Sequence, residues 1–191
     1  MKIIALSQPL SVSQNFSFAC LPDSALLRNN DDFYLPNFSE HISAQAGMYV
    51  QLHKIGKHIE AQFVPRYIKD CGLAINFTAI DALHELHKNS LPGDIARGFD
   101  HSFAVSSSTA AFGEHEQVKL QFEYNAKILL NTETSLLLEP LCQAIAKASE
   151  YFTYKIGDVF FVPLISSVTV HAGDVFSGSM NGEHCLNCAV R

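Results

Sequence analysis

Two short clusters of this sequence hold residue types that could bind a metal ion. His84 and His87 lie three residues apart, a spacing that places both imidazoles on one face of a helix. Residues 184–188, His-Cys-Leu-Asn-Cys, contain a C-x-x-C pair, which indicates zinc or redox chemistry only beside a second pair or in a thioredoxin setting. Neither accompanies it, so exposed helix histidines and an alternating last strand compete with the metal interpretation.

Motifs for a nucleophile or a nucleotide are missing from the sequence. Ser106, Ser107 and Ser108 follow one another, but no G-x-S-x-G turn surrounds them, so we expect a loop there. Neither a P-loop nor a G-x-G-x-x-G motif occurs, and a nucleotide ligand is therefore not indicated.

The composition is that of a folded protein with an acidic balance. The 191 residues are 48% hydrophobic and 17% charged, which disfavours disorder. Thirteen basic against nineteen acidic residues give a net charge of −6, which argues against nucleic acid or an anionic membrane as a partner. There is no apolar run long enough for a membrane span and no signal-peptide core. An odd number of cysteines, five, fits a reducing compartment, so we expect a cytoplasmic protein.

The elements that must position any site are mostly strands. The predicted strands share an alternating or continuously apolar pattern and cover 45–53, 71–77, 117–124, 159–162 and 165–170. Helical spacing covers 81–88 and 138–152, whereas at 59–68 it is interrupted by Pro65. With short strands and turns over 1–36, the pattern predicts one strand-dominated α+β domain over 1–191.

Four segments carry motifs of one known family in a single order. They are 21–27 (LPDSALL), 72–81 (GLAINFTAID), 91–100 (LPGDIARGFD) and 151–159 (YFTYKIGDV). In these segments the chain resembles the fumarylacetoacetate hydrolase family, in its C-terminal catalytic domain. The resemblance implies a rolled, mixed β-sandwich with a few short helices, in agreement with the element pattern.

The resemblance also implies an activity and a cofactor. Family members hydrolyse carbon–carbon bonds in β-diketo acids, decarboxylate oxaloacetate-like acids, or isomerise or hydrate hydroxymuconate-like diacids. They use one Mg²⁺ or Mn²⁺ held by carboxylates. Such a dication stabilises the charge that develops on an enolate as the bond breaks. Homodimers are common in the family, so a homodimer is expected here.

The family's metal ligands, carried over one by one, fall on residues without charge. Its Glu-x-Glu pair falls on Gln45 and Gly47, the histidine two residues earlier on Ser43, and the third carboxylate on Asn76. An amide oxygen can touch a divalent cation, but without a carboxylate the attraction that offsets dehydration of Mg²⁺ is missing. We therefore expect no metal site and no cofactor.

The family's substrate contacts have changed as well. Its arginine, tryptophan and Gly-Thr-Pro turn fall on Ile80, Gly93 and 162–164, and its lysine falls on Arg97. An arginine in the old cleft could bind a carboxylate through two parallel hydrogen bonds. The competing interpretation is a surface arginine paired with a nearby aspartate, Asp94 or Asp100.

Three functions remain open on these grounds. The first is a divergent, metal-free member that binds a small carboxylic acid through Gln45, Asn76 and Arg97. The second is an active enzyme with a rebuilt acid–base site, for which the candidates are His53, Asp81, Asp100 and His101. The third is a structural or regulatory partner of an active paralogue. A polar cleft near Asn76 would favour the first two, and a filled cleft the third.

Overall fold

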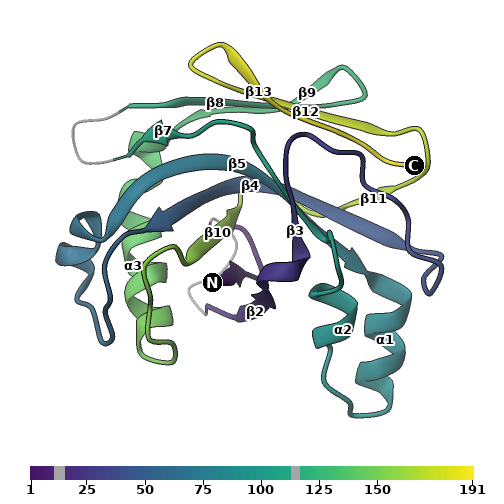
Figure 1. The fold of residues 1–191 in the computed structure, drawn as a ribbon, viewed down its shortest axis with the longest axis horizontal. Coiled ribbons are helices and arrows are strands. Elements are labelled where there is room, and N and C mark those ends of the chain that lie inside the picture. Colours follow the sequence, from purple (N-terminus) through teal and green to yellow (C-terminus); the bar gives the residue numbers. More distant parts are fainter. Residues whose placement is uncertain (11–15, 113–116) are drawn as a thin grey trace.

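Two long antiparallel strands, β4 (Ile42–Leu52) and β5 (Ile68–Ala79), run through the centre of the structure (Figure 1). The structure is a computed structural model, and it describes residues 1–10, 16–112 and 117–191. Around β4 and β5 a larger sheet forms in the order β2-β1-β10-β4-β5-β6-β3, with β11 on β4 and β7 on β5. Its other strands are β1 (Lys2–Leu6), β2 (Phe18–Pro22), β3 (Leu26–Leu27), β6 (Phe103–Val105), β7 (Ala110–Ala111), β10 (Val159–Pro163) and β11 (Val168–Val170).

A second, four-stranded sheet lies across β4 and β5 in Figure 1, on the side opposite β1 and β2. Its strands are β8 (Lys119–Tyr124), β9 (Lys127–Glu133), β12 (Val175–Met180) and β13 (Glu183–Ala189). The larger sheet is mixed, because β1 pairs with β10 and β3 with β6 in parallel while its other pairs are antiparallel. The expected strand-dominated, rolled mixed β-sandwich is confirmed.

Three α-helices and three short 3₁₀ helices complete the described residues. They are α1 (Ile80–Lys88), α2 (Asp94–Arg97), α3 (Leu138–Ser149), η1 (Asp23–Ala25), η2 (Ala61–Arg66) and η3 (Thr134–Leu136). In α3, Leu141, Ile145 and Ala148 are buried as the apolar stripe predicted. None of these helices is long and apolar enough to cross a membrane.

The central strands are buried on both faces, which the alternating pattern did not predict. One face of β4 carries Ala46, Met48 and Val50 into the main core, while Tyr49 on the other face is buried in a second cluster. The expected half-exposed strand over 45–53 was therefore wrong about burial, because β1, β2 and β10 curl back to cover that face.

Other boundaries differ for local reasons. Pro65 lies in a 3₁₀ helix, η2, instead of the α-helix considered for 59–68, since proline removes an α-helical donor. The expected strand at 165–170 shortens to β11, and the four-residue α2 was not predicted. The strands expected in 1–36 are present in the described part of that range, and residues 11–15 of it lie outside.

Candidate functional site

A cavity of about 170 Å³ lies where β1, β4, β5 and the end of α2 meet. Gln45 and Asn76, which the resemblance placed at metal-ligand positions, are direct cross-strand neighbours on β4 and β5 and both line it. Arg97, the last residue of α2, lines it as well. The rest of the lining consists of Ala5, Leu6, Ser7, Ala19, Ser43, Thr78, Ile80, Leu83 and Ser167.

The two amides are tied to the cavity wall in different ways. Gln45 Nε2 donates to the backbone carbonyl of Ser7 at 3.5 Å. Asn76 is only 7% exposed, and its Oδ1 is buried without a hydrogen-bond partner among the described residues. The hydroxyl of Ser7 is also buried and unpartnered in this part of the chain. Because buried polar atoms in proteins are nearly always paired, these atoms indicate that the cavity is built to hold a polar group.

Arg97 is held through its backbone, and its side chain is left without an anion. The buried Ser102 donates from Oγ to the Arg97 carbonyl at 3.0 Å, and Gly98 donates its N–H to the carbonyl of Asp94 at 2.7 Å. Within the described ranges the guanidinium makes no ion pair with Asp94 or Asp100. The surface-pair interpretation of Arg97 is therefore not supported.

Arg97 is the only charged residue among those that line the cavity. The wall otherwise offers hydroxyls, amides and apolar carbons, so the cavity has a positive potential within a protein of net charge −6. Such a cavity is suited to a small anion, because a guanidinium pairs with a carboxylate through two parallel hydrogen bonds.

The residues present do not fit a divalent cation. The family position that would carry the second glutamate is Gly47, and a Cβ there would lie 2.1 Å from the carbonyl oxygen of Val162 and 2.7 Å from Cα of Pro163. Both contacts are backbone atoms of β10, so no side chain can stand at this position in the observed sheet. The remaining donors, Gln45 and Asn76, are neutral, and the nearest charge in the lining is a cation.

Other metal donors are equally scattered in the described residues. No group of three His, Cys, Asp or Glu side chains there could hold a metal ion. The sequence has one Glu-x-Glu, Glu114-His115-Glu116, which the carry-over from the family did not use and which lies outside the described residues.

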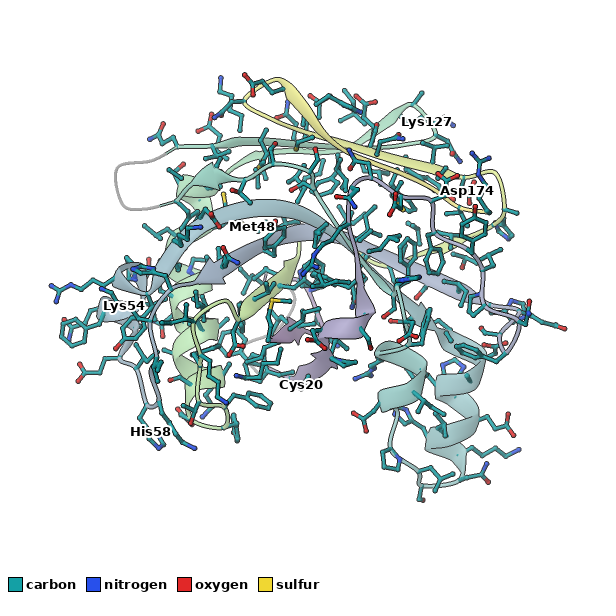
Figure 2. The ribbon with its side chains drawn as sticks, in the orientation of Figure 1. Cys20, Met48, Lys54, His58, Lys127 and Asp174 are labelled. Atoms are coloured by element: carbon teal, nitrogen blue, oxygen red, sulfur yellow. The ribbon has the colours of Figure 1, made fainter. Side chains whose placement is uncertain are left out.

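The four residues considered for a rebuilt acid–base site do not line the cavity. His53 lies just past β4, eight residues from Gln45 or about 26 Å at strand spacing. Its neighbour Lys54 is at the end of the molecule opposite α1 and α2 in Figure 2. Asp100 and His101 are exposed beyond α2.

Asp81 has a structural role. Its carboxylate accepts hydrogen bonds from Ser39 Oγ at 2.5 Å and from the N–H groups of Glu40 and Ala82 at 2.8 Å each. Desolvation acts to raise the pKa of Asp81, but these hydrogen bonds outweigh it and lower the pKa to about 2. A carboxylate held so firmly in its charged form is unsuited to proton transfer near neutral pH.

The remaining sequence motifs are structural as well. His84 and His87 are exposed on α1, and Cys185 and Cys188 are buried, free thiols on β13. Desolvation raises the pKa of Cys188 to about 12, so this thiol stays protonated and unreactive. Ser106 lies in the expected loop, where it donates to the Ser108 carbonyl.

Two features of the site could not be read from the sequence. The segment 162–164, expected as a substrate-contacting turn, instead ends β10 beside Met48 and Gly47 and does not line the cavity. Conversely, Ser7 and Ser167 line the cavity without belonging to any motif, and only the fold brings their segments to β4 and β5.

Solved structures share this fold. Fumarylpyruvate hydrolase from Pseudomonas aeruginosa, solved with Mn²⁺ and pyruvate, matches with a TM-score of 0.81 at 14% identity, over 99% of this chain and 88% of that chain. The 5-carboxymethyl-2-hydroxymuconate delta-isomerase from Mycobacterium smegmatis matches with a TM-score of 0.82 at 19% identity, over 99% and 76%. At such identities the likeness shows the fold alone.

Curated proteins and a family model extend the comparison to sequence. Oxaloacetate tautomerase of Escherichia coli (strain K12) is 22% identical over 173 residues, which are 88% of this chain and 78% of that protein. Uncharacterized proteins of Pyrococcus abyssi and Pyrococcus horikoshii are 24% and 25% identical over 140 residues, so the matched part spans only 62% and 61% of their length. The model for the fumarylacetoacetate (FAA) hydrolase C-terminal family matches residues 5–191, and the chain belongs to that family.

Proposed function

We propose that this chain is a divergent member of its family that binds a small carboxylic acid without a divalent metal ion. The observation that carries the proposal is Arg97, a cation without an ion pair that lines the same cavity as Gln45 and Asn76. In the metal-dependent relatives a dication attracts the acid, and here the guanidinium supplies that attraction.

The size of the cavity limits the ligand. A volume of about 170 Å³ equals the share of roughly five to six liquid waters and is below the ~300 Å³ of a typical drug-sized site. An acid of roughly three or four carbons fits this volume. Pyruvate, bound with Mn²⁺ in the Pseudomonas relative, is of this size.

The alternatives have less support. An active enzyme with a rebuilt site needs an acid or base near the ligand, and none of the four candidates lines the cavity. A purely structural partner would fill the cleft, whereas the described side chains leave it open. The homodimer, the cytoplasmic location and the single domain stay predictions.

Isothermal titration calorimetry with propionate and pyruvate tests the proposal on metal-stripped protein. We expect saturable binding that EDTA leaves unchanged and that Arg97→Ala weakens by about 1.5–3 kcal/mol, the range for charge-assisted hydrogen bonds. Arg66→Ala is the control, since that guanidinium lies over the Phe63 ring outside the cavity. Binding that needs added Mn²⁺, or an equal loss in both variants, contradicts the proposal.

A further inference from the structure

Within the described residues, the cavity offers more hydrogen-bond acceptors than its wall can satisfy. Gln45 uses Nε2 for the carbonyl of Ser7, which leaves Oε1 without a donor in this part of the chain. Across the strand pair, Oδ1 of Asn76 is buried and has no donor either. Two amide oxygens on neighbouring strands thus require donors, and the group that fills the cavity is the remaining source.

A donor is also unpartnered in the same lining. The Ser7 hydroxyl is buried without a hydrogen bond among the described residues. A hydroxyl group on the ligand satisfies both needs, because it donates one hydrogen bond and accepts another. A keto oxygen only accepts, so it leaves the amide oxygens unpaired. An ammonium group donates, but it brings a positive charge into a cavity whose one charged residue is Arg97.

We propose that the ligand is a short 2-hydroxy acid, an inference that rests on the acid-binding function proposed above. Its carboxylate pairs with the Arg97 guanidinium. Its hydroxyl donates to the amide oxygens of Gln45 and Asn76 and accepts from Ser7. The small volume favours the 2-position for the hydroxyl, because a longer spacing needs a larger acid than the cavity holds.

Calorimetry with three acids of equal carbon number tests this inference. The probes are each enantiomer of lactate, propionate, which lacks the hydroxyl, and pyruvate, which replaces it with a keto oxygen. We expect the preferred lactate enantiomer to bind about tenfold more tightly than propionate or pyruvate, as one additional satisfied hydrogen bond predicts. Equal affinity for the three acids overturns the inference and leaves the proposed function standing. No binding of any of them removes both.

Two variants assign the preference to the amides. Gln45→Met keeps the length of the side chain and removes the acceptor, and Asn76→Leu does the same at the neighbouring position. We expect at least one of them to lower the lactate-to-propionate ratio to about two or less while propionate affinity stays within about twofold. Gln51→Met, on the same strand but outside the cavity, is the control and keeps the wild-type ratio.

A thermal melt of each variant guards against misfolding. Asn76 is buried, so Asn76→Leu is interpreted only if it melts cooperatively, and the partly exposed Gln45→Met then carries the test alone. A wild-type ratio in every folded variant overturns the assignment to these amides.

Discussion

At the scale of single residues, the site differs from a metal site by a few atoms. Gln45 and Asn76 replace carboxylate oxygens with amides of nearly the same shape, so the cavity keeps its outline while its charge changes sign around Arg97. The family resemblance was enough to bring these three residues together, because the motif spacing fixes the register of β4 against β5. It was not enough for Ser7 or Ser167, since their place in the wall depends on chain segments that no local pattern pairs with β4.

Restoring the carboxylates reverses both properties of the cavity. We expect wild-type protein to bind Mn²⁺ no more tightly than the millimolar range, about −4 kcal/mol. In the double variant Gln45→Glu, Asn76→Asp we expect Mn²⁺ binding at least about tenfold tighter and propionate binding at least about tenfold weaker, because the new carboxylates attract the dication and pair with Arg97.

Calorimetry with Mn²⁺ and with propionate measures both changes. Gln51→Glu adds a carboxylate to β4 outside the cavity and is the control. Micromolar Mn²⁺ binding by the wild type that Asn76→Leu abolishes would show that the metal site survives.

At the scale of elements, the sequence predicted the type of each long element better than its burial. The apolar stripe of α3 and the run 71–77 within β5 are local signals, and both formed as expected. Burial of Tyr49 is not local, because it depends on β1 and β10 folding over that face of β4. Short pieces such as α2 carry too few residues for a periodic signal and were missed for that reason.

Asp81 joins the start of α1 to the loop before β4, and acid should weaken this joint. The folded-state pKa of about 2 lies below the ordinary 3.8, so the carboxylate stabilises the fold above about pH 4, and this contribution is lost as the pH falls towards about 2. After allowance for solvent exposure, we expect Asp81→Asn to cost about 1 kcal/mol near neutral pH and to match the wild type near pH 2.

Urea unfolding of both proteins across this pH window measures the difference. Asp23→Asn, at an exposed position without a recorded hydrogen bond, is the control. A cost for Asp81→Asn that stays constant down to about pH 2 would separate this residue from the acid dependence.

At the scale of the whole molecule, the two ends of the chain's main sheet are tied by charge. The buried carboxylate of Asp158 accepts hydrogen bonds from the backbone N–H of Lys2 at 3.0 Å and from that of Lys155 at 2.7 Å, and it forms an ion pair with the Lys2 ammonium. This contact joins the first strand to the turn before β10, residues more than 150 positions apart. It thereby fixes the β1 wall that carries Ser7 into the cavity.

Loss of that carboxylate should unsettle the whole fold. We expect Asp158→Ala to lower the free energy of unfolding by about 3 kcal/mol, because it leaves buried donors and a partly buried ammonium without their partner. Chemical denaturation measures the change, with the exposed Asp31→Ala as the control. A loss no larger than that of the control would show that the ion pair is dispensable.

The contact between Gly47 and β10 also sets a direction on how this sequence can change. An ancestor with a carboxylate at this position must have held β10 farther from β4, and the present sheet closes that space down to 2.1 Å from the missing Cβ. Any side chain that returns there first forces apart backbones paired from Val159 to Pro163, before a metal ion can offer compensation. Gly47 therefore acts as a ratchet: the amides at 45 and 76 can revert by single substitutions, but the complete ligand set returns only after the sheet itself has been rebuilt.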